Sequence, residues 1–144
     1  MRTGGRLSRR AAALVVASVT GSVLAAAAWL EPDPSGLGTH QQLNLPPCGW
    51  ISSGGLPCPT CGMTTAFALA ADGRVLAALA TQPAGAALAI GSACLLLGAT
   101  LVLVTGLDLR PALERILTPR FWWGAAGLIL VGWGWKIALF RGWL

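Results

Sequence analysis

Two long apolar stretches of the sequence contain no charged residue, and this feature restricts the fold more than any other. Residues 11–30 form one such run of 20 residues, and residues 83–107 form another of 25. At about 1.5 Å per residue, a helix of roughly 20 residues crosses the ~30 Å hydrocarbon core of a bilayer. A third apolar run, residues 121–140, is interrupted only by Lys136. The sequence therefore predicts an all-α membrane protein with three transmembrane helices, built as a single domain over residues 1–144.

Composition and charge placement agree with a membrane protein. The chain is 55% hydrophobic and only 10% charged, whereas a soluble domain of this size needs more polar surface to cover its core. Its net charge of +5 would suggest nucleic-acid binding if the basic residues formed one patch, but they cluster at the ends of apolar runs. These clusters comprise Arg2, Arg6, Arg9 and Arg10, and Arg110, Arg115 and Arg120. We therefore expect a lipid bilayer as the main partner, and no nucleic acid.

The arginine clusters also predict the orientation of the chain. Because basic residues concentrate on the cytoplasmic side, the N-terminus and the loop 108–120 are expected in the cytoplasm. The segment 31–82 and the C-terminus are then extracytoplasmic. Tryptophans near the span ends, such as Trp29 and Trp133, suit the boundary between lipid and water. The first run also resembles a cleavable signal peptide, but it exceeds the roughly 7–15 apolar residues of such signals, which favours a retained anchor.

The outer segment is expected to be irregular at first and helical later. Residues 31–57 are rich in Gly and Pro, which indicates turns and loops. Residues 63–71 and 75–80 are apolar and helix-compatible but too short to span a bilayer. A single span over residues 62–82 would place Asp72 and Arg74 near its centre, at a cost of about 2.5–3.5 kcal/mol each. The sequence therefore predicts two short interfacial helices between the first and second spans.

Three of the four cysteines fall in this outer segment, and two of them form a Cys-Pro-x-Cys motif. The motif is Cys58-Pro59-Thr60-Cys61, and Cys48 precedes it. Pro59 suits the first position of a helix, so we expect Cys58 to cap that helix with its sulfur beside unpaired N–H groups. Such a position lowers a thiol pKa and favours the thiolate. Cys61 would return one turn later, close enough to form a disulfide or share a metal.

Three hypotheses account for these cysteines. Cys58 and Cys61 can cycle between dithiol and disulfide, with Cys48 as an exchange partner. Alternatively, Cys48, Cys58 and Cys61 bind a zinc-type metal with His40 as fourth ligand; otherwise no cofactor is expected. The simplest hypothesis is a structural disulfide that staples the loop. The fourth cysteine, Cys94, lies within the second run and is interpreted as a small buried apolar residue.

Lys136 lies in the outer half of the third run, on the side of the cysteines. Its simplest interpretation is a lysine whose long side chain reaches the headgroups. The alternative hypothesis is that its ammonium neutralises a thiolate at the cysteine motif.

The stretch Cys58-Pro59-Thr60-Cys61-Gly62-Met63-Thr64-Thr65-Ala66 resembles a known family, the small bacterial membrane proteins called domain of unknown function 2752. That resemblance implies a motif that includes Pro59, Gly62, Thr64 and Thr65, then a short helix, a charged turn, a second short helix and a transmembrane span. Thr65 stands where the family usually has Arg, and Gln82 where it usually has Asn. The resemblance supplies no reaction, substrate or cofactor.

The sequence thus predicts a small integral membrane protein of unassigned activity with an extracytoplasmic cysteine motif. Thiol–disulfide exchange or metal binding at that motif is the chemical hypothesis, and a role other than catalysis is favoured because no hydrolase-type constellation is present. The alternative is a non-enzymatic assembly subunit whose stapled loop docks another membrane protein or a second copy of the chain.

Overall fold

A computed structural model describes residues 3–143, with side chains from residue 7 onward, so Arg2 and the side chain of Arg6 lie outside the described residues. The described chain is helical and contains no strand. The elements are α1 (Thr3–Trp29), the 3₁₀ helix η1 (Thr39–Leu43), α2 (Gly49–Gly54), α3 (Met63–Ala71), α4 (Val75–Thr81), α5 (Pro83–Thr105), α6 (Arg110–Ile116) and α7 (Pro119–Phe140). The all-α fold predicted from the sequence is confirmed.

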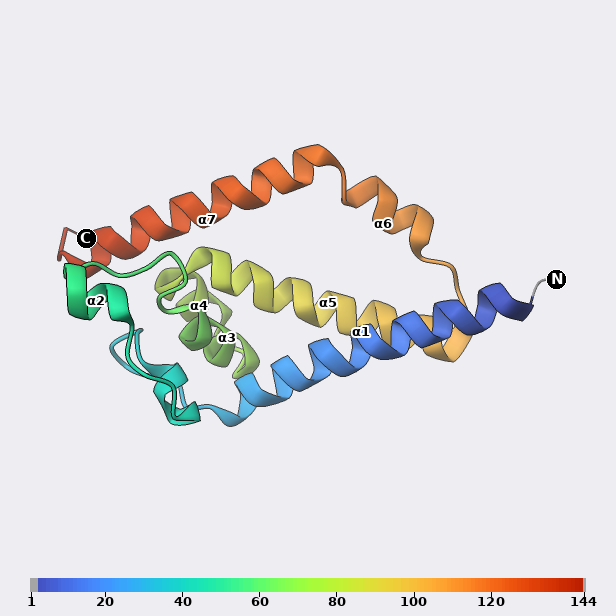
Figure 1. Cartoon of the computed structure of the whole chain (residues 1–144), viewed down its shortest axis with the longest axis horizontal. Coiled ribbons are helices and arrows are strands. Elements are labelled where there is room, and N and C mark those ends of the chain that lie inside the picture. Colours follow the sequence, from blue (N-terminus) through green and yellow to red (C-terminus); the bar gives the residue numbers. More distant parts are fainter. Residues whose placement is uncertain (1–2, 144) are drawn as a thin grey trace.

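Within the described residues 3–143, three helices are long and apolar enough to cross a membrane. They cover Leu7–Trp29 in α1, Pro83–Thr105 in α5 and Pro119–Phe140 in α7. The predicted spans agree with these helices to within a few residues at each end. The second span ends earlier than predicted because Gly106, at φ 73°, terminates α5 in the left-handed conformation. Three spans also place the two termini at opposite ends of the molecule (Figure 1).

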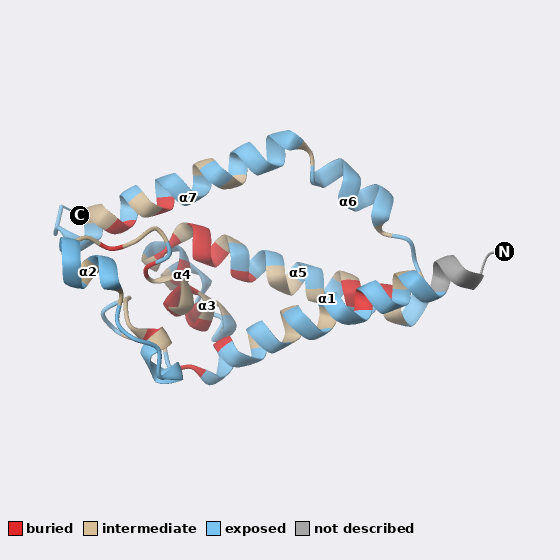
Figure 2. Cartoon of the chain, in the orientation of Figure 1, coloured by how far each residue is buried: buried red, intermediate tan, exposed pale blue. Residues whose placement is uncertain are grey.

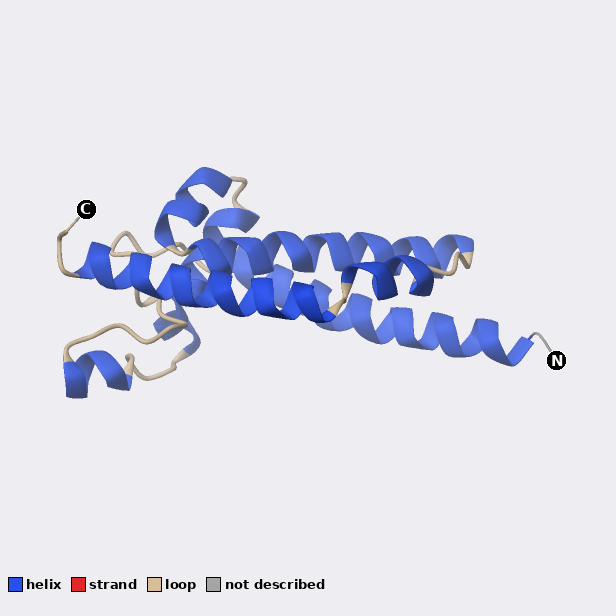
Figure 3. Ribbon diagram, turned by 90° about the horizontal axis from the view of Figure 1, so that it is seen from above, coloured by secondary structure: helices blue, strands red, loops and turns tan. Residues whose placement is uncertain are grey.

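The two predicted short helices are present as α3 and α4, which form a hairpin on one side of the long helices (Figure 3). Two other expectations were incomplete. The segment 31–57, predicted as irregular, contains η1 and α2, and the loop 108–120 contains α6. These elements are only five to seven residues long, so they carry too few apolar positions for a periodic pattern to reveal them.

Small residues allow the helices to pack closely. Ala66 and Leu69 of α3 pack with Ala78 of α4 and Ala86 of α5 in one buried cluster. The backbone of α3 approaches α5 so closely that a Cβ on Gly85 would lie 3.1 Å from the Cβ of Ala66. Close approach of this kind is the usual way in which helices associate in lipid. The α3–α4 hairpin is therefore fixed against the start of the second span.

Much of the remaining apolar surface faces outward. Large hydrophobic side chains such as Leu97, Val104 and Val131 are exposed along α5 and α7. Figure 2 shows that buried residues concentrate near α3, α4 and the beginning of α5, whereas α7 is exposed along most of its length. An apolar surface of this extent suits lipid rather than water as the surrounding solvent.

The arginine-rich regions meet at the end of the molecule opposite the cysteines. Arg9 of α1 forms a salt bridge of 2.7 Å with Asp108, which follows α5. The side chain of Arg10 lies beside Gly106, the residue that ends α5. The first span and the 108–120 segment thus share one end, as the sequence predicted, and α2 lies at the other (Figure 1).

Candidate functional site

The Cys-Pro-x-Cys motif forms a tight turn that precedes α3. The N–H of Cys61 donates to the carbonyl of Cys58 at 3.0 Å, and the N–H of Met63 donates to the carbonyl of Thr60 at 3.1 Å. Gly62 follows at φ 85° and occupies the cap position of α3. The prediction that Cys58 caps this helix was therefore wrong. The left-handed residue Gly62 reorients the chain after Cys61, so the helix begins at Met63 instead of Pro59.

Cys48, rather than Cys58, is the cysteine that caps a helix. It occupies the N-cap position of α2, where the backbone N–H groups of Trp50 and Ile51 favour its thiolate. Burial opposes ionisation of Cys48, but hydrogen bonds from the Cys61 thiol and from Ile51 and Trp50 outweigh it and lower the pKa of Cys48 to about 7. The lowered thiol pKa that was expected at Cys58 is therefore found at Cys48, ten residues earlier in the chain.

The sulfur atoms of Cys48, Cys58 and Cys61 all lie within 4.8 Å of one another, and we call these residues the cysteine cluster. All three are free thiols, and 3.2 Å separates the sulfurs of Cys58 and Cys61. Cys61 is buried, whereas Cys48 and Cys58 are partly exposed. Burial, together with hydrogen bonds to Cys58 and Cys48, raises the pKa of Cys61 to about 12. The cluster therefore combines a readily ionised thiol with one that stays protonated.

His40 and Cys94 lie outside the cysteine cluster. The cluster of potential metal ligands contains the three cysteines without His40, whose Nε2 lies 3.2 Å from the carbonyl oxygen of Pro46. The structure thus brings together three of the four metal ligands considered from the sequence. Cys94 is exposed on α5, and not buried as the sequence suggested.

Two polar side chains hold the motif turn against the transmembrane helices. Trp133 of α7 donates its indole N–H to the carbonyl of Pro57 at 2.9 Å. Gln82 donates to the carbonyl of Pro59 at 3.1 Å, and its side-chain oxygen accepts the N–H of Gly85 at 2.7 Å. The completely buried Gln82 thereby caps α5 and fixes the motif with one amide group. The sequence marked both positions, Trp133 as a boundary residue and Gln82 as a departure from a family pattern, but it gave neither partner.

Lys136 is buried beneath the motif. Only 5% of its surface is exposed, and its ammonium donates to the carbonyls of Gly36 at 3.0 Å and Thr81 at 3.4 Å. Its interpretation as a lysine that extends to the headgroups was therefore wrong. A Cβ on Gly62 would lie 2.9 Å from this ammonium, and the charges of Lys136 and Cys61 are close enough to interact. Lys136 thus places a positive charge directly beneath the turn that carries Cys61.

Thr65 is buried and bonded to Thr39. The two hydroxyl oxygens are 2.8 Å apart, and Thr39 also accepts the N–H of Asp33 at 3.0 Å. This contact joins the start of α3 to η1. The hydroxyl of Thr65 thus bonds to another residue of the same chain.

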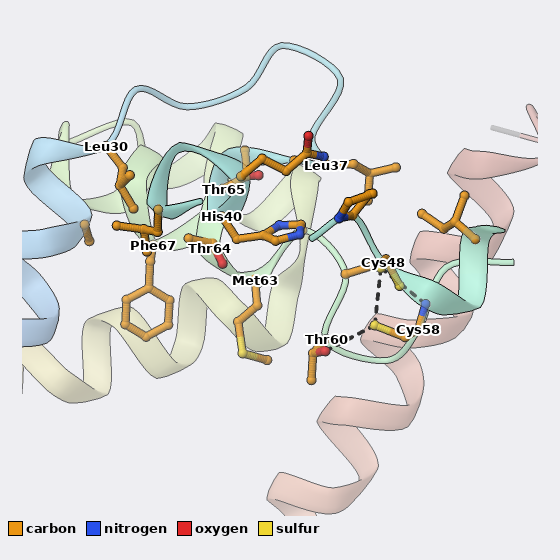
Figure 4. Close-up of a pocket in the computed structure, with 18 of the residues that line it drawn as sticks. Leu30, Leu37, His40, Cys48, Cys58, Thr60, Met63, Thr64, Thr65 and Phe67 are labelled. Atoms are coloured by element: carbon orange, nitrogen blue, oxygen red, sulfur yellow. Dashed lines mark hydrogen bonds between the residues drawn. The ribbon is translucent and has the colours of Figure 1, made fainter. Parts of the chain in front are cut away.

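The cysteine cluster borders a cavity of about 750 Å³. Figure 4 shows Leu30 and Phe67 toward one side of this cavity, Cys48 and Cys58 toward the other, and His40 and Met63 between them. Residues from the end of α1, from η1, from α2 and from the beginning of α3 contribute to the lining. Among the other motif residues, Gly62, Thr64 and Thr65 also line it.

Residues 48–96 match the model of a family described as "Protein of unknown function (DUF2752)". The match begins at the first cysteine of the cluster and ends within α5, so it contains the motif, the α3–α4 hairpin and the first half of the second span. The resemblance noted from the motif is thereby confirmed. No curated protein and no solved structure matches the chain.

Proposed function

We propose that this protein carries out thiol–disulfide exchange through the cysteine cluster at the extracytoplasmic face of the membrane. The observation that carries the proposal is the mutual proximity of three free thiols within 4.8 Å, in unequal surroundings. A structural staple uses two sulfur atoms and leaves the third without a role. Exchange uses all three, because a thiolate must attack one sulfur of an existing disulfide.

The arrangement supports a relay centred on Cys61. When Cys58 and Cys61 form a disulfide, the thiolate of Cys48 attacks the sulfur of Cys61. A Cys48–Cys61 bond forms, the Cys58–Cys61 bond breaks, and Cys58 leaves as a thiolate, with no net oxidation. The partly exposed Cys48 and Cys58 are then the two positions at which an external thiol or disulfide reacts, while buried Cys61 stays inside.

The side of the membrane on which the cysteine cluster lies is part of the proposal, and it is inferred from the positions of the arginines. Arg9 and the Arg110–Ile116 helix lie at the end of the molecule away from the cluster. By the positive-inside rule that end faces the cytoplasm, and the cluster faces the oxidising compartment in which disulfides form and persist.

Redox titration of the purified protein in mild detergent tests the exchange. The variant Cys94→Ala serves as the starting protein and matched control, because Cys94 is exposed and outside the cluster. In mixtures of reduced and oxidised glutathione, we expect two of the three remaining thiols to disappear and reappear reversibly, as counted by alkylation and mass spectrometry. Cys61→Ser should abolish the Cys58–Cys61 bridge. Cys48→Ser should retain it but slow its exchange with glutathione.

Two outcomes would contradict the proposal. Three thiols that never form an internal bridge under oxidising glutathione would exclude exchange. A bridge that persists in the folded protein against excess dithiothreitol would favour the alternative of an assembly subunit with a stapled loop.

Metal binding is a second candidate, supported by the spacing of the same sulfurs. Zinc binds thiolates at about 2.3 Å, which places two ligand sulfurs roughly 3.8 Å apart. The separations within the cluster, all at most 4.8 Å, permit this geometry with small side-chain movements. Lys136 would partly balance the negative charge of a zinc ion held by three thiolates. Elemental analysis separates the candidates: one zinc per chain, with thiols that alkylate only after chelation, would favour metal binding over exchange.

A further inference from the structure

The cavity beside the cysteine cluster is larger than exchange between thiols requires. Its volume of about 750 Å³ lies within the ~300–1,000 Å³ typical of sites for small organic ligands. Much of its wall is apolar and comes from Val23, Ala26, Ala27 and Leu30 at the end of α1, together with Phe67 of α3. The thiols of Cys48, Cys58 and Cys61 form part of the same wall. A molecule in this cavity would therefore contact both apolar side chains and reactive sulfur.

The cavity reaches the surface of a transmembrane helix. Ala26 and Val23 line the cavity and are also exposed on α1, and both belong to the span Leu7–Trp29. The surface of α1 around these residues faces lipid if the helix crosses the bilayer. A hydrophobic molecule dissolved in the membrane would thus reach the cysteine cluster without passing through water.

We propose that this cavity binds a lipid-soluble quinone, which oxidises the cysteine cluster. The inference rests on the proposed exchange function and names the oxidant that would restore its disulfide. The thiols of Cys58 and Cys61 form one S–S bond and release two electrons and two protons. The quinone accepts both electrons and both protons on its two ring oxygens and leaves as a quinol. The reaction is therefore balanced without a further oxidant.

The lining offers both apolar side chains for the tail of a quinone and hydrogen-bond donors for its ring oxygens. Its isoprenoid-like tail would lie against Val23, Ala26 and Phe67, toward lipid. Gln41, in the polar part of the lining, brings an amide N–H that can donate to a ring oxygen, whereas Nε2 of His40 is already bonded to the carbonyl of Pro46. Figure 4 shows His40 between the apolar side chains and the cysteines, where the ring of such a molecule would lie.

The test uses the full chain with Cys94→Ala, reduced in detergent and mixed with decylubiquinone, a benzoquinone with a ten-carbon tail. Quinol formation is followed by ultraviolet absorbance, and thiols are counted by alkylation. We expect one quinol formed and two cluster thiols lost per chain. Ala26→Phe should reduce the initial rate at least tenfold, because the larger ring fills the cavity mouth. Ala28→Phe is the matched control on the same helix: Ala28 is also exposed but does not line the cavity, so the rate should not change.

Folding and binding are checked separately. Ala26→Phe should elute from gel filtration and melt as the starting protein does. Decylubiquinol, which cannot oxidise thiols, should protect Cys58 from alkylation, whereas decanol at the same concentration should not.

Three results would overturn the inference. The first is that no quinol forms. The second is that quinol forms at the same rate in Ala26→Phe and Ala28→Phe. The third is that decanol protects Cys58 from alkylation as well as decylubiquinol does, which would identify a groove for acyl chains. If glutathione still exchanges with the cluster in any of these cases, only the quinone proposal fails. If glutathione exchange is also absent, the proposed function fails first.

Discussion

Replacing Gly62 by alanine tests how the motif is held. The same replacement at Gly73 separates the cost of the backbone conformation from the cost of steric overlap. Gly62 at φ 85° and Gly73 at φ 76° both adopt the left-handed conformation. An alanine at either position therefore loses about 1–2 kcal/mol through its backbone alone. At Gly73, between α3 and α4, an added Cβ meets nothing within 4 Å. Gly73→Ala thus measures the backbone cost by itself.

At Gly62 the added Cβ also has no room. It would lie 2.8 Å from the carbonyl oxygen of Gly36 and 2.9 Å from the Lys136 ammonium, which are the two partners of a partly buried hydrogen bond. Forcing an extra carbon into a packed site typically costs about 1–3 kcal/mol. The free energy of unfolding should therefore fall by about 2–5 kcal/mol in Gly62→Ala, against about 1–2 kcal/mol in Gly73→Ala.

Unfolding by sodium dodecyl sulfate in mixed micelles, followed by circular dichroism, measures both variants under one condition. Alkylation of Cys61 in the native micelle provides a second readout. This buried thiol should become accessible in Gly62→Ala and remain slow in Gly73→Ala. Equal losses of stability in the two variants would refute the proposed close contact between the motif turn, Gly36 and Lys136.

Two further predictions concern Gln82 and Cys48. Gln82→Ala removes both the cap of α5 and the bond to the Pro59 carbonyl, so we expect a loss of about 1–3 kcal/mol in the same unfolding assay. Gln42→Ala is the matched control: it also removes two bonds to backbone groups, those of Glu31, but at an exposed site, so it should cost less. A pKa of about 7 for Cys48 means that its thiolate fraction, and hence its rate of alkylation, rises about tenfold between pH 6 and 8 and then levels off. Peptide mass spectrometry of the reduced protein with a chelator measures that rate. A continued rise of about a hundredfold over the same interval would indicate a thiol with an ordinary pKa.

The spans and the two short helices could be predicted from the sequence because a backbone in lipid has few alternatives to a helix. Charge-free runs of sufficient length must be helical to satisfy their backbone groups, and Asp72 and Arg74 made a span over residues 62–82 too costly. The order of motif, charged turn and Gln82-Pro83 break then located α3 and α4. These are local properties of the chain, which a sequence displays directly.

The geometry of the site depends on contacts between distant residues, and the sequence did not reveal it. Trp133 contacts Pro57, 76 positions earlier, and Lys136 contacts Gly36, 100 positions earlier. Cys48 became a helix cap only because six residues in a Gly- and Pro-rich segment form α2. The sequence could place three cysteines in one loop, but it could not indicate which of them lies at a helix N-terminus.

The position of Lys136 explains how the site combines a buried charge with reactive sulfur. An isolated ammonium in a transmembrane helix is costly, and here its N–H groups are satisfied by backbone carbonyls from the loop before η1 and from the end of α4. The lysine therefore joins three segments of the chain: α7, the loop before η1 and the end of α4. Its charge also favours an anion at Cys61, whose ionisation is opposed by burial and by hydrogen bonds to Cys58 and Cys48. When Cys61 is displaced from a disulfide as a thiolate, the adjacent ammonium lowers the energy of that thiolate. A neutral Lys136→Met variant should consequently retain the Cys58–Cys61 bridge but resist its reduction, which is the opposite of what a purely structural lysine would produce.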